Sequence, residues 1–334
     1  MFDWQIIGHK KITHFLEQTI VNHKLAHGYL FYGQKQLGKK TLVKKFIQTL
    51  LCYENDPKKE NLPCGTCPAC QQILKNNYPD IIWLKKETEK KEITIEQIRS
   101  LQSTLSTHSF FKSYKIALIE NVENLNNNAA NAFLKTLEEP HKKTIIILTA
   151  NNLHSIPPTI LSRVQKIKLL PVPAKEIYNF LLSQGKTHEE ARILAKISEG
   201  KPGRTLTFLR APDLWQGYLN QIKIFFYLVV GSYHQRLVFT EKILNKTDNS
   251  SDKLKTISPM LNIWQLLFRD LVLLKLNQND KIINIIELEK LAKISQKYTP
   301  RELLNIIKNI QKLKKDLLTN VNIKLALENL LLQF

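Results

Sequence analysis

The sequence predicts a parallel α/β domain that carries a four-cysteine insertion and is followed by helices to the end of the chain. Short apolar segments alternate with helical patterns as far as about residue 170, which is typical of a parallel sheet. The strand signal disappears from about Ala174. The 334 residues are enough for two or three domains, and 43% of them are apolar, which suffices for ordinary cores.

The predicted elements of the first half follow one another in a regular order. Residues 11–25 carry apolar side chains at helical spacing, and Gly28–Tyr32 is a short aromatic strand. A glycine loop over residues 33–41 leads into a second helical pattern that starts at Leu42. Further strands are predicted at residues 80–84, 115–119, 144–149 and 166–170, and further helices at residues 94–106 and 128–138.

The second half is predicted to be helical, with short helices over residues 174–208 and longer ones over residues 212–334. Its most apolar stretch, Leu261–Leu276, contains Arg269 and Asp270 and is too short and too charged to span a bilayer. The first residues lack the basic and apolar regions of a secretory signal. We therefore expect a soluble, cytoplasmic protein.

The chain is strongly basic, with 49 Lys and Arg against 29 Asp and Glu and a formal net charge of +20. Such an excess favours polyanionic partners such as nucleic acid or nucleotides. The excess is spread over both halves, and the sequence is rich in Lys, Asn and Ile throughout, as a genome-composition bias would produce. Charge alone therefore does not decide the function.

The glycine loop has the spacing of a phosphate-binding loop. Gly33, Gly38 and Lys39 fit the pattern G-x-x-x-x-G-K, after a strand and at the start of a helix. The next residue should be a Ser or Thr that binds Mg²⁺, but it is Lys40. Thr41 lies about 100° further round the helix and cannot simply take over. We predict a loop that keeps its shape but does not support hydrolysis; the alternative is a working site.

A second element of ATP hydrolysis is also altered. ATPases place an acidic pair at the end of a buried strand to hold the metal and activate water. In this chain, Glu120 and Asn121 follow the predicted strand at residues 115–119. Asn cannot act as a carboxylate base. The two changes together favour a chain that does not hydrolyse ATP.

All four cysteines of the chain fall within one short segment, at Cys52, Cys64, Cys67 and Cys70. Thiolates at C-x-x-C spacing can share one tetrahedral Zn²⁺, and four of them leave no open position for water. The sequence therefore predicts a structural zinc site. Disulfides, which a cytoplasmic compartment disfavours, and unliganded thiols are the alternatives.

The order of these motifs resembles the AAA+ clamp-loader subunits of bacterial DNA polymerase III. The resemblance rests on Ala26–Phe31, the cysteine cluster, Ala129–Pro140, Pro158–Arg163 and Lys201–Arg204, and it covers residues 5–208. Tyr78 and Val164 depart from the family, which usually has His and Cys there. Within the family, the tau/gamma branch keeps a hydroxyl residue after the loop Lys and an acidic pair at the strand end. The present sequence has neither, which favours a non-hydrolysing branch over an active tau/gamma-like ATPase motor.

The resemblance implies an architecture: an AAA+ α/β domain at residues 1–166 with a zinc module at 52–70, a helical lid at 167–208 and a helical collar domain at 209–334. It implies a five-membered ring that loads the sliding clamp onto primed DNA together with tau/gamma and delta subunits. In such rings ATP lies between neighbouring subunits.

The resemblance also implies roles for particular residues. Arg163, in the Ser162-Arg163 segment, would act in trans as an arginine finger on a neighbour's ATP site, and Arg204 would belong to a sensor segment of the lid. The degenerate nucleotide site would comprise Gly33, Gly38, Lys39, Lys40, Thr41 and Arg204, with ATP and Mg²⁺ doubtful. A third hypothesis is a nucleic-acid-binding zinc module that uses Lys58, Lys59 and Lys75.

Overall fold

The structure is a computed structural model that describes residues 2–52, 62–87, 90, 92–111, 113–245, 250–317 and 321–334. The chain divides into two compact units. The first comprises Met1–Phe180 with Gly200–Gly203, and the second comprises Leu181–Glu199 with Arg204–Phe334. The three-domain division at residues 166 and 208 stays a prediction. Lys58 and Lys59 of the nucleic-acid hypothesis lie outside the described residues.

The first unit is built on a five-stranded sheet with the order β2-β3-β4-β1-β5, and every strand pair is parallel. The strands are β1 (Gly28–Tyr32), β2 (Ile81–Leu84), β3 (Lys115–Ile119), β4 (Thr144–Ala150) and β5 (Gln165–Lys168). Strands β3 and β4 are buried along their whole length, as expected for central parallel strands covered on both faces. The predicted parallel α/β fold class is thereby confirmed.

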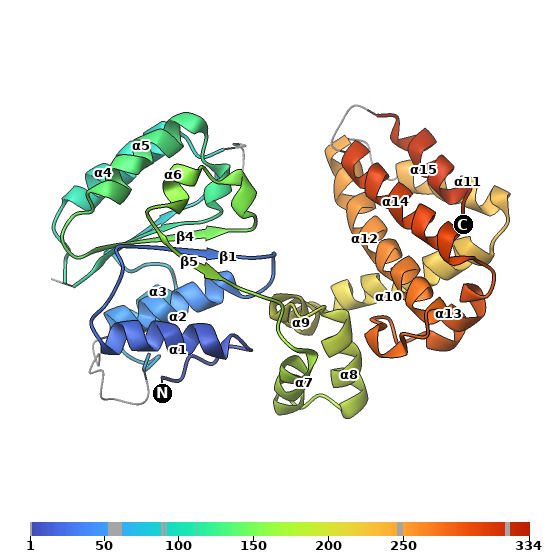
Figure 1. The fold of residues 1–334 in the computed structure, drawn as a ribbon, viewed down its shortest axis with the longest axis horizontal. Coiled ribbons are helices and arrows are strands. Elements are labelled where there is room, and N and C mark those ends of the chain that lie inside the picture. Colours follow the sequence, from blue (N-terminus) through green and yellow to red (C-terminus); the bar gives the residue numbers. More distant parts are fainter. Residues whose placement is uncertain are drawn as a thin grey trace. The chain divides into compact units, whose positions relative to one another are not determined.

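Helices cover both faces of this sheet (Figure 1). One face carries α1 (Lys10–Val21), α2 (Lys39–Leu51) and α3 (Pro68–Leu74), and the other carries α4 (Ile95–Ser106), α5 (Asn127–Glu138) and α6 (Pro158–Leu161). Short 3₁₀ turns lie at Val122–Asn124 and Leu153–Ser155. Side chains alternate between the faces, so Tyr29 and Phe31 of β1 join the core beneath α2 while Leu30 joins the core beneath α5.

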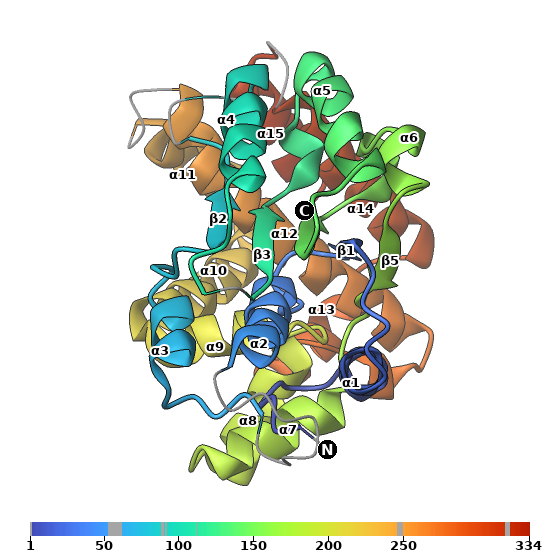
Figure 2. The same ribbon diagram turned by 90° about the vertical axis from the view of Figure 1, so that its left-hand side faces the viewer.

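The second unit is helical in its described part. It contains α8 (His188–Ile197), α10 (Pro212–Val230), α11 (Tyr233–Asn245), α12 (Ser250–Lys275), α13 (Leu288–Ser295), α14 (Pro300–Asp316) and α15 (Ile323–Leu331), with a 3₁₀ turn at Asn279–Lys281. Helices α7 (Ala174–Ser183) and α9 (Pro202–Arg210) lie where the chain passes between the units. Figure 2 shows the same elements from a second direction. Aromatic rings of Phe225, Trp264, Phe268 and Phe334 meet in the core.

Helix α12 is the central helix of the second unit. Its segment Thr256–Lys275 is long and apolar enough to cross a membrane by length and composition alone. Leu261, Trp264 and Phe268 of this segment are fully buried in the core. Asp270 is also fully buried and accepts backbone hydrogen bonds from the loop that follows the helix. These contacts are those of a core helix in a bundle.

Candidate functional site

The glycine loop connects the end of β1 to the start of α2, as the sequence predicts. Gly33 has φ +149°, and a Cβ atom there would lie 2.5 Å from the carbonyl oxygen of Leu169. Gly38 precedes the first residue of α2 and has φ +89°, a left-handed conformation that glycine adopts without strain. Both glycines are therefore required by the backbone geometry of the loop.

The ammonium group of Lys39 is bonded within the chain. Its Nζ donates to the carbonyl oxygens of Gly33 at 2.6 Å and Gln34 at 2.8 Å, and to Oδ1 of Asn151 at 3.0 Å. An ammonium has three N–H donors, so these contacts use all of them. Burial lowers the pKa of Lys39, although the carboxylate of Glu123 partly opposes this. These hydrogen bonds hold the Lys39 side chain against the backbone of the glycine loop and against Asn151.

Lys40, the residue after the loop lysine, forms an ion pair with the end of strand β3. Its Nζ lies 2.6 Å from Oε1 of Glu120, the residue directly after β3. The glycine loop and the strand end, the two elements in which the sequence has altered residues, are thus brought into contact through Lys40 and Glu120. Thr41, the residue after Lys40, lies exposed on α2.

Sequence reasoning missed Asn151, which connects the two halves of this site. Its side-chain Nδ2 donates to Oδ1 of Asn121 at 2.9 Å and to Oε1 of Glu123 at 2.8 Å, while its Oδ1 accepts from Lys39. Asn121 has φ +54°, a left-handed conformation that Asn tolerates better than most residues. The sequence signal that could have identified Asn151 is its position directly after β4. Ligands of parallel sheets bind at the carboxyl ends of the strands.

The segment Lys201–Arg204 reaches the glycine loop through its glycine. The N–H of Gly203 donates to the carbonyl oxygen of Gln36 at 2.8 Å, and a Cβ atom at Gly203 would lie 2.8 Å from that oxygen. Arg204 belongs to the second unit. There its guanidinium pairs with Glu199 and lies over the ring of Tyr218, 5.6 Å from the centroid.

Arg163 lies just after α6, with its side chain about one third exposed. Its Nη1 donates to the carbonyl oxygen of Thr159 at 3.0 Å and to Oγ of Ser162 at 3.1 Å. Its Nη2 lies 2.6 Å from Oε1 of Glu138, at the end of α5. None of these partners belongs to the glycine loop of the same chain.

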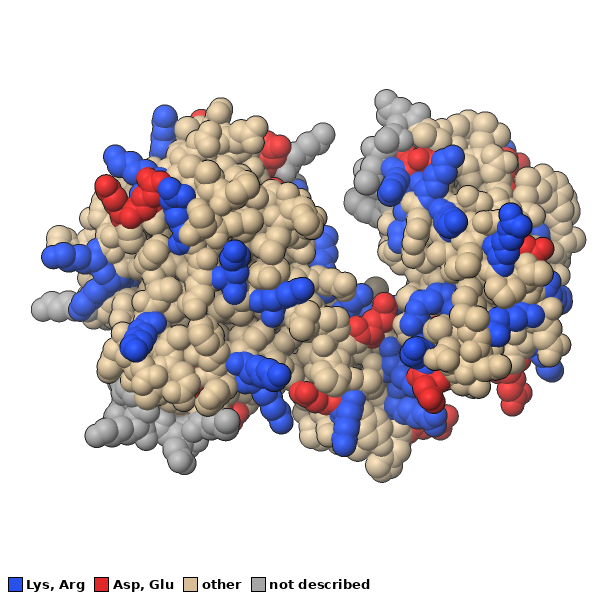
Figure 3. Space-filling model, viewed as in Figure 1, with Lys and Arg blue, Asp and Glu red and all other residues tan. Residues whose placement is uncertain are grey.

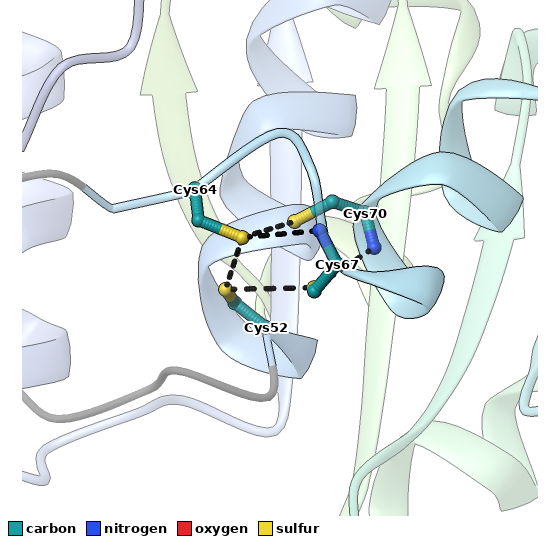
Figure 4. Close-up of side chains that lie close together, drawn as sticks. All are labelled: Cys52, Cys64, Cys67 and Cys70. Atoms are coloured by element: carbon teal, nitrogen blue, oxygen red, sulfur yellow. Dashed lines mark hydrogen bonds between the residues drawn. The ribbon is translucent and has the colours of Figure 1, made fainter.

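The four cysteines converge at the end of α2 and the start of α3 (Figure 4). The Sγ of Cys52 lies 3.5 Å from that of Cys64 and 3.9 Å from that of Cys67, and Cys64 lies 3.9 Å from Cys70. All four sulfurs lie within 4.8 Å of one another, and none is in a disulfide. This cluster can hold a metal ion.

The environment of the cluster favours a thiolate at one position. Burial raises the pKa of Cys64, but hydrogen bonds from the backbone N–H groups of Cys67 and Thr66 outweigh it and lower this pKa to about 6. Burial raises the pKa of Cys70. A bound cation would stabilise the thiolate form at all four positions, because metals bind deprotonated cysteine.

Lys and Arg side chains are scattered over the visible face of each unit rather than gathered in one patch (Figure 3). Lys75, the one described lysine of the nucleic-acid hypothesis, is exposed at the end of α3.

Comparisons with known proteins connect both units to one family. The sequence profile described as DNA polymerase III, delta subunit, matches residues 8–173, and the profile of its C-terminal part matches residues 235–334. The DNA polymerase III subunit delta' of Bacillus subtilis is 27% identical over 323 residues, which cover 96% of this chain and 94% of that protein.

Two further relatives bear on the branch of the family. The subunit delta' of Buchnera aphidicola (Schizaphis graminum) is 30% identical over 300 residues, and the alignment covers 89% of this chain and 85% of that protein. The subunit tau of Bacillus subtilis is 26% identical over 77% of this chain, which spans only 45% of that protein.

Proposed function

From the premise that this chain belongs to the family of DNA polymerase III delta' subunits, we propose that it is a clamp-loader subunit that does not itself hydrolyse ATP. The observation that carries this proposal is the ion pair between Lys40 and Glu120, at 2.6 Å. An ammonium and a carboxylate there neutralise one another where catalysis needs a hydroxyl, a divalent cation and a free carboxylate.

The state of the other loop residues supports the same proposal. Lys39 would have to give up three hydrogen bonds before it could reach a phosphate oxygen. Asn121 offers an amide where a base would be needed, and its oxygen already accepts from Asn151. We propose that Gly33, Gly38, Lys39, Lys40 and Thr41 retain the shape of a nucleotide site and that Mg-ATP binds there weakly at best. Arg204, which is paired with Glu199, would add little to it.

In the proposed assembly, Arg163 acts on the ATP site of a neighbouring tau/gamma subunit. Its contacts with Thr159 and Ser162 hold one edge of the guanidinium. About one third of the side chain is exposed, and the ion pair with Glu138 would open when Nη2 turns to another chain. A guanidinium supplied in trans stabilises the charge that develops on the transferred phosphoryl group and is worth about 10³–10⁵ in rate. Ser162 would position this arginine, since its Oγ accepts one of the guanidinium N–H groups.

We further propose that the metal of the cysteine cluster is Zn²⁺. Four thiolates at Zn–S distances of about 2.3 Å around a tetrahedral ion lie ~3.8 Å apart. The sulfur distances of 3.5 and 3.9 Å fit this spacing. When bound, the ion would supply a cross-link with no open coordination position. Through this ion, Cys52 at the end of α2 would be linked to Cys67 and Cys70 at the start of α3.

The proposed partners are the tau/gamma and delta subunits, the sliding clamp and primer-template DNA, and the proposed location is the cytoplasm. A relative named as a tau subunit supports the first of these partners. The net charge of +20 is compatible with DNA inside the assembly.

The trans role of Arg163 is tested by reconstituting the chain with tau/gamma, delta, sliding clamp and primed DNA. We expect Arg163→Ala to lower ATP turnover by the assembly, because one site loses its trans guanidinium. Arg192→Ala, which removes an exposed arginine from α8, should leave turnover unchanged. Equal turnover by the wild-type and Arg163→Ala assemblies, with thermal unfolding confirming that both chains are folded, would refute this role.

A further inference from the structure

A small basic pocket lies on one side of α2, next to the glycine loop. It is open to solvent, has a volume of about 220 Å³ and is lined by Lys40, Thr41, Lys44, Lys45, Gln48 and Leu74. We call it the lysine pocket. Residues four apart on a helix are neighbours, so Lys40 and Lys44 share one side of α2, and Lys45 follows directly. Leu74 at the end of α3 forms the opposite wall.

The positive charges of this pocket are not balanced by the part of the chain that the structure describes. Lys40 pairs with Glu120. No described Asp or Glu forms an ion pair with Lys44 or Lys45, and the nearest polar contact of Lys44 is the carbonyl oxygen of Leu74 at 3.5 Å. Three ammonium groups therefore share one carboxylate among the described residues.

The partial burial of Lys44 adds to the cost of this excess of charge. Lys44 is partly buried, and its Nζ lies 5.4 Å from the ring centroid of Trp83, while that of Lys40 lies 5.9 Å from it. Burial lowers the pKa of Lys44, and the charge of Lys40 lowers it further, against a smaller opposing effect of Glu120. An anion in the pocket would relieve both the repulsion and the loss of hydration.

We propose that the lysine pocket binds a phosphate-class oxyanion without a metal ion. Lysine binds phosphate as a point charge with three donors, and a tetrahedral oxyanion offers acceptors to several ammonium groups at once. The hydroxyl of Thr41 adds a further donor to the lining. The volume of about 220 Å³ far exceeds the ~10–15 Å³ that one water molecule requires. This site goes beyond the clamp-loader role, because no other subunit is needed to form it.

Titration of the purified full chain with inorganic pyrophosphate, at low salt and without divalent cations, tests the site. We expect the double variant Lys44→Gln/Lys45→Gln to bind at least about tenfold more weakly, since each lost charge-assisted hydrogen bond is worth roughly that factor. The matched control is Lys10→Gln/Lys11→Gln, which removes the same charge from exposed positions on α1. The proposal fails if both double variants bind alike, or if wild type does not bind.

Two further binding experiments locate the anion and identify its source. Lys39→Gln changes the glycine loop and should leave the pyrophosphate affinity within about twofold of wild type. A change of that size is well below the effect of one charge-assisted hydrogen bond. A loss of affinity equal to that of the pocket variant would place the anion in the loop and refute the proposal. A single-stranded oligothymidylate whose affinity falls with Lys44→Gln/Lys45→Gln would identify nucleic-acid phosphates as the source. An oligonucleotide affinity insensitive to that variant would identify a free anion.

Discussion

Lys40 and Glu120 are the two residues on which the proposed loss of a metal site depends. In a phosphate-binding loop the residue after the lysine offers a hydroxyl to Mg²⁺. In this chain it offers an ammonium, which lies 2.6 Å from the carboxylate of Glu120. The sequence alone indicated altered residues in the loop, at Lys40, and at the strand end, at Asn121. The contact between Lys40 and Glu120 depends on where the fold places the start of α2 relative to the end of β3, which no local pattern reveals.

Replacing Lys40 should therefore restore part of the metal dependence. We expect Lys40→Thr to increase Mg-ATP affinity by about tenfold over metal-free ATP, the scale on which single groups at metal sites change affinity. The substitution supplies a hydroxyl and frees the carboxylate of Glu120. Nucleotide titration with and without Mg²⁺ measures this, with Lys10→Thr as the control. An unchanged dependence on Mg²⁺ would mean that Lys40 does not determine the metal site.

Asp270 is a buried carboxyl group of the second unit whose pKa is shifted by its surroundings. Its carboxylate is fully buried and accepts hydrogen bonds from the backbone N–H of Asn284 at 2.8 Å and of Ile283 at 3.2 Å, and from Nδ2 of Asn284 at 2.8 Å. Burial nevertheless raises its pKa. Between the unfolded and the raised folded pKa the folded chain binds more protons than the unfolded chain, so its stability falls as pH rises.

This sign gives a prediction for the isolated chain. The free energy of unfolding of wild type, relative to Asp270→Asn, should increase as pH is lowered from 7 toward 4, because only wild type regains the proton at this site. Denaturant unfolding at a series of pH values measures the difference. A difference that stays constant, or that decreases toward low pH, would contradict the raised pKa of Asp270.

At the scale of elements, strands were more predictable from sequence than helix ends. The apolar runs of β3 and β4 are buried throughout, so composition alone located them. The helix expected over residues 11–25 ends at Val21, because Asn22 caps it and His23 adopts φ +53°. Spacing also predicted the cysteine cluster correctly. Asn151 escaped notice because its partners lie on two other segments, the start of α2 and the turn after β3, which only the folded sheet brings next to it.

We expect the short helix α3 to depend on the cysteine cluster as well as on its own packing. It spans only Pro68–Leu74, and two of the four cysteines lie at its start. We expect a strong zinc chelator to lower the thermal unfolding midpoint of wild type, because closed four-thiolate sites contribute folding free energy directly. Cys52→Ser should begin at a lower midpoint and respond less to the chelator. If the wild-type midpoint does not change after metal is shown to be removed, the site has no structural role.

At the scale of the whole molecule, sequence motifs identified the family, while the chemistry of the chain depends on tertiary contacts. The profile matches cover residues 8–173 and 235–334, and the motifs quoted from the sequence lie almost entirely within the first of these ranges. The second unit was predictable only as helical, because its core of aromatic side chains carries no functional motif. A subunit of this kind would contribute Arg163 and a rigid fold to an assembly whose ATP sites lie elsewhere.

The most direct test of this account is ATP hydrolysis by the isolated, metal-replete chain in the presence of Mg²⁺. We predict turnover at the background rate of the buffer, because Lys40 and Glu120 neutralise one another and Asn121 supplies no base. Turnover well above that rate, within the ordinary range of about 1–10³ s⁻¹ for enzymes, and lost on substitution of Lys39 by Ala, would contradict the account.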